Sequence, residues 1–179
     1  MRAALFLDRD GVINVDHGYV CSPERTEFVD GIFDLIAAAN RRDMAVVVVT
    51  NQAGIARGHY SERQFRDYMA WMRETLRERG AHLDAIYHCP HHPDAGIGKY
   101  RRVCGCRKPA PGMILAAQRE MDLDLSASLL IGDKESDLAA GLAAGVGLNL
   151  RLGSVQLPTL FDALPLLPSM TSSRSLAGH

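Results

Sequence analysis

The chain alternates short, almost continuously apolar runs with longer segments of helical periodicity. The apolar runs cover residues 4–8, 45–50, 85–89, 128–133 and 147–152. Strands covered on both faces, as in a parallel sheet, show such continuous hydrophobicity, whereas strands with one wet face alternate apolar and polar residues. The pattern therefore predicts five buried strands.

Helical patterns separate the predicted strands, and the longest of them places Phe65, Met69 and Leu76 on one face. Residues suited to helix starts and ends mark the boundaries: Asp30, the capping-box pair Ser61 and Gln64, Gly80, Pro111, and Ser136 or Asp137. Regular alternation of strand and helix predicts an α/β fold with a doubly wound, mostly parallel, Rossmann-like sheet.

Composition and charge narrow the class of protein. The 179 residues, 47% hydrophobic and 23% charged, predict one globular domain over residues 1–168 and a flexible tail over residues 169–179, which has no periodic pattern. The net charge of −1 gives no general attraction to nucleic acid or anionic membranes. Neither a secretory signal nor a membrane-spanning segment is predicted. We therefore expect a cytoplasmic monomer that acts on a small molecule, without nucleic-acid or membrane partners.

Polar residues stand at the ends of three predicted strands, namely Asp8, Thr50 and Asp133. In open parallel sheets, ligands bind beyond the carboxyl ends of the strands. These residues are therefore expected to face one crevice, although they are far apart in the sequence.

The first of these segments, FLDRDGVIN, carries Asp8 and Asp10 two positions apart. Such a pair can bind a hard cation through oxygen, and one carboxylate can attack phosphorus to form an aspartyl phosphate. Asp10 would then be placed to protonate the leaving alcohol and to deprotonate water. The alternative is an ordinary solvated turn, since Asp and Gly are common there. Asp133, with Lys134 and Asp137 nearby, is a further candidate metal ligand.

Two other segments offer partners for phosphate. Thr50 and Asn51 supply a hydroxyl and an amide after a strand, and Arg107 and Lys108 precede a predicted helix start. Cations beside helix N-terminal amides form anion sites. Taken singly, each of these residues has an equally ordinary interpretation as a turn, cap or surface residue.

Residues 89–106, CPHHPDAGIGKYRRVCGC, contain three of the four cysteines. Two i, i+2 pairs frame this loop: Cys89 with His91, and Cys104 with Cys106. Three thiolates and one imidazole match a closed, structural zinc site. A Cys-x-Cys redox pair and a loop with idle cysteines are the alternatives, His92 competes with His91 as ligand, and Cys21 is expected to be free.

The motifs follow a fixed order along the chain: D-x-D-G at 8–11, a strand-end Thr, a Lys before a helix, and G-D-x-x-x-D at 132–137. In this order they resemble the haloacid dehalogenase (HAD) superfamily of Mg²⁺-dependent phosphohydrolases, over roughly residues 3–152. Within it the chain is most similar to phosphatases of heptose bisphosphates. Since there is little room for inserted elements, we expect a HAD fold with a zinc-binding loop and no separate cap domain.

The resemblance implies a role for each matching residue. Asp8 would be the nucleophile and Asp10 the general acid/base. Mg²⁺ would bind the side chains of Asp8 and Asp133 and the backbone carbonyl of Asp10. The residues that bind the transferring phosphoryl group would be Thr50, Asn51 and Lys108. Residues further out would contact the substrate or order the acidic site: Arg57, Arg107 and Lys134. Zinc in the loop, with His91 as its histidine ligand, also agrees with the family pattern.

The implied activity is removal of the 7-phosphate from a heptose 1,7-bisphosphate, in the synthesis of lipopolysaccharide core precursors. A histidinol-phosphate phosphatase is the nearest alternative, but the long insert PDAGIGKYRRV favours the heptose enzyme. Polynucleotide 3′-phosphatases are disfavoured by the balanced charge. A phospho-accepting receiver domain and a zinc-binding interaction module remain the alternatives that are not enzymes.

Overall fold

The computed structural model describes residues 1–169 and shows five strands in one parallel sheet, in the order β3-β2-β1-β4-β5. The strands are β1 (Ala4–Leu7), β2 (Ala45–Asn51), β3 (Ala85–Cys89), β4 (Leu129–Gly132) and β5 (Leu148–Arg151). The predicted parallel α/β fold is confirmed. The predicted flexibility of the tail concerns residues that lie, apart from Ser169, outside the described part.

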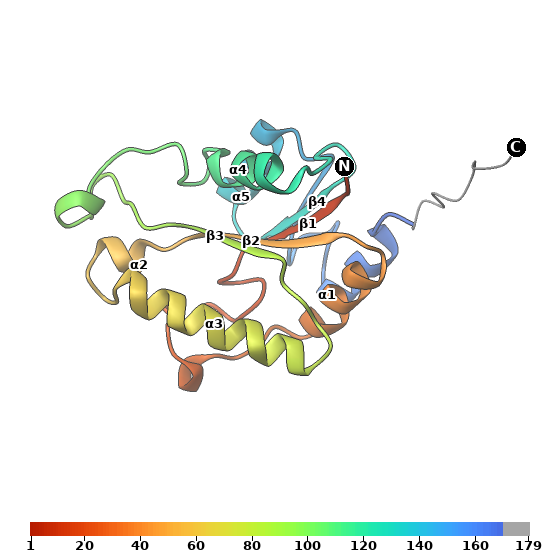
Figure 1. The fold of residues 1–179 in the computed structure, drawn as a ribbon, viewed down its shortest axis with the longest axis horizontal. Coiled ribbons are helices and arrows are strands. Elements are labelled where there is room, and N and C mark those ends of the chain that lie inside the picture. The colour runs from red at the N-terminus through yellow and green to blue at the C-terminus, as the bar shows by residue number, and fades with distance from the viewer. Residues whose placement is uncertain (170–179) are drawn as a thin grey trace, which may run out of the picture.

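Helices cover both faces of the sheet (Figure 1). The main helices are α1 (Ile32–Arg41), α3 (Glu62–Glu78), α4 (Gly112–Met121) and α5 (Glu135–Ala144), and α2 (Ala53–Ala56) is one short turn. Within β1, Leu5 and Leu7 pack into the core beneath α1 and α3, whereas Ala4 and Phe6 pack toward α4 and α5. Since successive side chains of a strand point to opposite faces, this two-sided burial explains the continuous apolar runs.

Most helix boundaries agree with the sequence signals. Ser61 and Gln64 form the predicted capping box at the start of α3, and Gly80 follows that helix with a left-handed φ of 76°. The N-cap of α1 was predicted wrongly, because Gly31, with a φ of 86°, occupies that position instead of Asp30. Helix α5 also begins at Glu135, slightly earlier than predicted.

Loops at the carboxyl edge replace a cap domain within residues 1–169. One loop joins β1 to α1 and contains a short 3₁₀ turn, Pro23–Arg25. A longer loop joins β3 to α4 and extends away from the sheet, with a second 3₁₀ turn at Gly98–Tyr100 (Figure 1). In the part of the chain that the structure describes, no helix is long and apolar enough to cross a membrane.

Candidate active site

The polar strand ends converge as the sequence predicts. Asp8 follows β1, Thr50 lies near the end of β2 and Asp133 follows β4, and these strands are neighbours in the sheet. A cleft of about 670 Å³ opens at this edge. Its lining includes most of the predicted site residues: Asp8, Asp10, Asn51, Arg57, Arg107, Lys108 and Lys134.

Lys108 is buried between two carboxylates. Its Nζ lies 2.9 Å from Asp8 Oδ1 and 2.6 Å from Asp137 Oδ1, and it also donates to the carbonyl of Val49 at 2.8 Å. Burial lowers the pKa of Lys108, but the two carboxylates outweigh burial and raise it. The ammonium is therefore held charged beside Asp8.

The groups around Asp8 shift the pKa of its carboxyl group in opposite directions. Burial raises the pKa of Asp8 to about 7; Lys108 opposes that shift and Asp137 adds to it. Oδ1 of Asp8 accepts hydrogen bonds from Lys108 Nζ and from the backbone N–H of Arg9, at 2.9 and 2.8 Å. A divalent cation beside this carboxyl group would favour the anionic, nucleophilic form.

Carboxylate oxygens of Asp8, Asp133 and Asp137 all lie within 4.8 Å of one another. Asp137 is already engaged, because its Oδ2 accepts the backbone N–H groups of Asp133 and Lys134 at 3.1 and 3.0 Å, and its Oδ1 pairs with Lys108. The carboxyl groups left for a cation are therefore those of Asp8 and Asp133.

Asp133 fits a hard cation. Its Oδ1 is buried and has no hydrogen-bond partner within residues 1–169. A Cβ at Gly11 would lie only 2.2 Å from Asp133 Oδ2, so glycine lets the loop after β1 approach this carboxylate closely. Mg²⁺ binds oxygen ligands, and the carboxylates of Asp8 and Asp133 together with the backbone carbonyl of Asp10 would provide them.

Three donor nitrogens, one from each of three side chains, make four contacts with the carboxylate of Asp10. One Arg9 guanidinium nitrogen contacts both of its oxygens at 2.7 and 2.9 Å, Asn14 Nδ2 donates at 3.1 Å and Gln52 Nε2 at 3.2 Å. Arg9 is fully buried, and its guanidinium lies 5.1 Å from the centroid of the Tyr68 ring. These contacts fix the Asp10 side chain at the wall of the cleft.

Thr50 and Asn51 lie in different surroundings. Thr50 is fully buried, and its Oγ1 accepts from Gln52 Nε2 at 2.8 Å. The Asn51 side chain bridges to the backbone of Lys108, accepting from its N–H at 3.0 Å and donating to its carbonyl at 3.1 Å. Asn51 thereby positions the Lys108 segment, so any contact with phosphate would use the groups that this bridge leaves free.

Basic side chains line the outer part of the cleft, although burial and the neighbouring Arg107 lower the pKa of His92 and favour its neutral ring. Arg57, His92, Arg107 and Lys134 all belong to its lining, and Arg57 and Lys134 are exposed. Arg107 is anchored by a hydrogen bond from Nη1 to the carbonyl of His91, at 3.2 Å. An anionic group beyond the transferring phosphate would meet this cationic rim.

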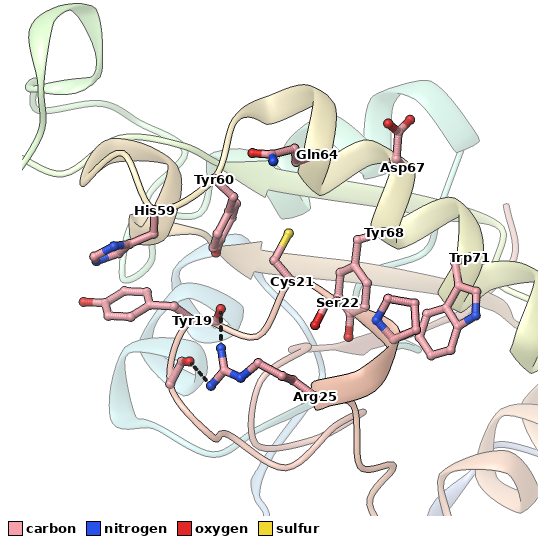
Figure 2. A pocket seen from close by; sticks show the side chains of 12 residues that line it. Tyr19, Cys21, Ser22, Arg25, His59, Tyr60, Gln64, Asp67, Tyr68 and Trp71 are labelled. Atoms are coloured by element: carbon pink, nitrogen blue, oxygen red, sulfur yellow. Dashed lines mark hydrogen bonds between the residues drawn. The ribbon is translucent and has the colours of Figure 1, made fainter.

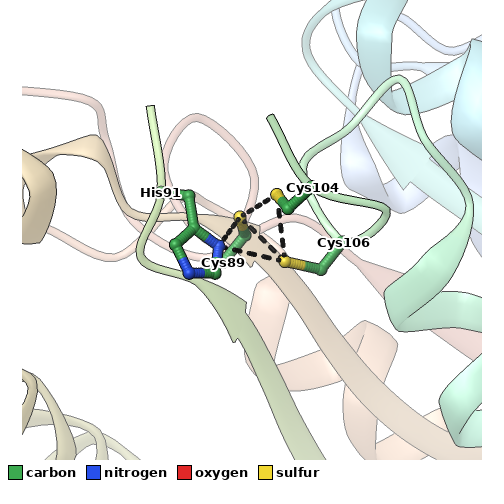
Figure 3. A group of neighbouring side chains, drawn as sticks. All are labelled: Cys89, His91, Cys104 and Cys106. Carbon is green, nitrogen blue, oxygen red and sulfur yellow. Dashed lines mark hydrogen bonds between the residues drawn. The ribbon is translucent and has the colours of Figure 1, made fainter. Parts of the chain in front are cut away.

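The cysteine loop brings its four candidate ligands together (Figure 3). The sulfur atoms of Cys89, Cys104 and Cys106 lie 3.1–3.5 Å apart, and His91 Nδ1 lies 3.6 and 3.5 Å from the sulfurs of Cys89 and Cys106. All three cysteines are free of disulfides. Three sulfurs and one ring nitrogen around one centre fit a tetrahedral zinc ion.

His92 faces a different environment from His91. Its Nδ1 accepts the backbone N–H groups of Asp94 and Ala95 at 3.1 and 2.9 Å, and the residue lines the cleft. The geometry therefore groups His91, and not His92, with the cysteines.

A second cavity of about 700 Å³ adjoins the cleft (Figure 2). Gly18, Tyr19 and Tyr60 line both spaces. The Tyr19 ring lies 4.4 Å from that of His59, and Arg25 donates to the carbonyls of Gly18 and Tyr19 at 2.8 and 3.2 Å. The β1–α1 loop thus forms one wall of the site.

Three buried residues of the site received no role from the sequence: Arg9, Gln52 and Asp137. Asp137 belongs to the G-D-x-x-x-D motif and was noted near Asp133, but no chemical role was assigned to it. Its ion pair with Lys108 joins residues that are distant in the sequence, and no local pattern signals such a contact. Gln52 follows the Thr-Asn pair directly, which was the available clue.

Known proteins with similar sequences and structures identify the family. A HAD-hydrolase-like family model matches residues 105–155. The D-glycero-alpha-D-manno-heptose-1,7-bisphosphate 7-phosphatase of Burkholderia mallei is 57% identical over 147 residues, which are 82% of this chain and 78% of that protein. The chain belongs to the heptose-1,7-bisphosphate 7-phosphatase family of HAD-like hydrolases. The beta-configured counterpart from Escherichia coli K12 is 50% identical over 80% of this chain and 75% of that protein.

A solved structure of this family agrees in fold. The D,D-heptose 1,7-bisphosphate phosphatase from B. bronchiseptica, complexed with magnesium and phosphate, has a TM-score of 0.72 and 38% identity, covering 83% of this chain and 79% of its own. Membership of the family confirms the predicted HAD superfamily and phosphatase class. The receiver and zinc-module alternatives are thereby excluded.

Proposed function

We propose that the chain removes the 7-phosphate of D-glycero-D-manno-heptose 1,7-bisphosphate, with Asp8 as nucleophile. The observation that carries this proposal is the buried Lys108, which lies 2.9 Å from Asp8 at the base of the cleft. It puts a fixed positive charge beside an aspartate that can attack phosphorus. The names and the similarity of the relatives support the substrate.

The reaction begins when an Asp8 oxygen attacks the phosphorus atom, so that a new P–O bond forms as the bond to the sugar oxygen breaks. Asp10 gives its proton to the departing oxygen. In the second half Asp10 takes a proton from water, whose oxygen attacks the phosphorus of the aspartyl phosphate, and Asp8 leaves as a carboxylate.

Stabilisation of charge comes from the groups around Asp8. Lys108 and the Thr50 hydroxyl would contact the oxygens of the transferring phosphoryl group. Asp8, Asp133 and the backbone carbonyl of Asp10 would hold Mg²⁺, which neutralises phosphoryl charge when bound. Asp137 keeps Lys108 in place through its 2.6 Å ion pair.

The cationic rim favours a bisphosphate over histidinol phosphate. Arg57, Arg107 and Lys134 can bind a second phosphate while the first lies beside Lys108. Histidinol phosphate carries an ammonium group instead of that phosphate, and these cations would repel it. The rim therefore supports the heptose substrate independently of the relatives' names.

Phosphate release from both anomers of heptose 1,7-bisphosphate and from histidinol phosphate tests this proposal. We expect the kcat/KM of one bisphosphate anomer to exceed that of histidinol phosphate by about a hundredfold or more, since each lost charged contact costs about 1.5–3 kcal/mol. Phosphorus NMR of the product would show phosphate remaining at carbon 1. Faster turnover of histidinol phosphate would refute the assignment.

Zinc in the cysteine loop forms a second part of the proposal. Cys89, His91, Cys104 and Cys106 would use all four positions of a tetrahedral ion, so this zinc would be structural. Arg107 and Lys108 directly follow Cys106. Zinc would therefore act on catalysis by fixing Arg107 at the rim of the cleft and Lys108 at its base.

Loss of zinc should thus reduce both the order of the cysteine loop and the phosphatase activity. The purified protein is expected to contain one zinc per chain, and Cys104→Ser should lower that content and the thermal midpoint, because binding energy of about 10 kcal/mol is coupled to loop folding. Elemental analysis and thermal unfolding provide the measurement. Cys21→Ser, which changes a cysteine outside the cluster, is the matched control. A zinc-free wild type with full activity would contradict the proposal.

A further inference from the structure

Gln52 connects two groups that the reaction needs. It directly follows β2 and is only 2% exposed. Its Nε2 donates to Thr50 Oγ1 at 2.8 Å and to Asp10 Oδ2 at 3.2 Å. One amide nitrogen therefore spans the proposed phosphate contact and the proposed general acid, and it uses both of its hydrogens.

Tyr60 determines which way the amide faces. The amide nitrogen of Gln52 faces Asp10 Oδ2 and Thr50 Oγ1, so the amide oxygen faces away from both. That oxygen accepts from the Tyr60 hydroxyl. Burial raises the pKa of Tyr60, so the phenol keeps the proton that it donates.

Packing fixes Tyr60 in turn. The residue is 8% exposed, and its ring lies against Gly54, where a Cβ would come within 2.4 Å of a ring carbon. Gly54 is therefore needed for the close approach of this ring. The close packing of the ring against Gly54 holds the Tyr60 hydroxyl within reach of Gln52.

The orientation of Gln52 also directs the Thr50 hydroxyl. Since Thr50 Oγ1 accepts from Gln52, its own hydrogen points elsewhere. Its contact with the carbonyl of Asn51 is 3.5 Å, which is long for a hydroxyl hydrogen bond. Within residues 1–169 the Thr50 hydrogen therefore has no short acceptor, which leaves it for an oxygen of the phosphoryl group in the proposed complex.

We propose that Gln52, oriented by Tyr60, is a positioning residue that aims the Thr50 hydroxyl at the phosphoryl group and holds Asp10 for proton transfer to the leaving oxygen. This inference rests on the proposed function. A sugar alkoxide is a poor leaving group and depends on proton donation, whereas p-nitrophenolate does not. Misplacement of Asp10 should therefore affect the sugar phosphate selectively.

Tyr60→Phe tests the inference, because it removes only the hydroxyl and keeps the ring against Gly54. We expect kcat/KM to fall about tenfold for heptose bisphosphate but no more than about twofold for p-nitrophenyl phosphate. Gln52→Leu removes both donated bonds, so it should lower kcat/KM on both substrates through Thr50 and lower it further on heptose bisphosphate through Asp10. Tyr87→Phe is the matched control, since the Tyr87 hydroxyl donates to Glu120 at 2.6 Å and the residue lies outside the cleft lining.

Equal losses on the two substrates in folded Tyr60→Phe and Gln52→Leu, or no loss, would overturn the inference. The proposed function is judged separately, by the wild-type preference among phosphate esters. If the wild type prefers another alkyl phosphate, the proposed substrate fails. The losses in kcat/KM of the two variants on that ester, compared with their losses on p-nitrophenyl phosphate, then still decide the role of Gln52.

Discussion

Replacing Asp8 with asparagine is expected to lower kcat by on the order of 10⁴-fold or more, because an amide cannot form the acyl phosphate. The fold should persist. An asparagine oxygen can still accept from Lys108 Nζ and from the backbone N–H of Arg9, which now bind Asp8 at 2.9 and 2.8 Å. Phosphate release at saturating heptose bisphosphate and Mg²⁺ measures the loss, and acid quenching should trap phosphorylated protein in the wild type only.

Asp30→Asn provides the matched control, since Asp30 is exposed and lies outside the cleft lining. This variant should keep the wild-type kcat. The intact mass of Asp8→Asn must be checked, because deamidation would restore the aspartate. A mass-verified variant that still turns over at a substantial fraction of the wild-type rate would refute Asp8 as nucleophile, and Asp133 would be the next carboxylate to test.

Much of the fold could be predicted because its determinants are local. Continuous apolar runs at residues 45–50 and 128–133 identified strands that the sheet buries on both faces. The Ser61 and Gln64 capping box identified the start of α3, because both of its hydrogen bonds lie within one turn. Turn geometry was less predictable, as the left-handed Gly31 at the start of α1 shows.

The predictable part of the site is the part carried by strand ends. Asp8 and Asp133 could be grouped because a parallel sheet brings its carboxyl ends together. The cysteine loop could be grouped because its two ligand pairs have zinc-like spacing, although the spacing alone left His91 and His92 as rivals. The structure separates the two histidines by their different partners.

Contacts between distant, buried polar groups could not be predicted. Asp137 looks like an N-terminal helix residue, and Gln52 looks like a turn residue. Asp137 acts through Lys108 and Gln52 acts through Asp10, and each partner lies on a different segment of the fold. Asn51 is a further example. The sequence suggested that its side chain binds phosphate, whereas in the structure it forms two hydrogen bonds with the backbone of Lys108.

Lys108→Met is expected to be destabilising as well as inactivating. The substitution keeps the length of the side chain but leaves Asp8 and Asp137 as buried carboxylates without their shared cation. Breaking a buried ion pair from one side costs about 3–5 kcal/mol, and losing a cation at the phosphoryl group costs on the order of 10²–10³ in kcat. Urea unfolding without added Mg²⁺ and phosphate release with it measure the two effects.

Adding Asp137→Asn to Lys108→Met separates the two effects. The double variant removes one of the uncompensated carboxylates, so it should regain about half of the lost unfolding free energy while kcat stays low, because the cation beside Asp8 is still missing. Lys99→Met, at an exposed lysine of the zinc loop, should leave stability within about 0.5 kcal/mol of the wild type. If Asp137→Asn restored no stability, Asp137 and Lys108 would not act as a buried pair, and if it restored turnover, the charge of Lys108 would not be what phosphoryl transfer requires.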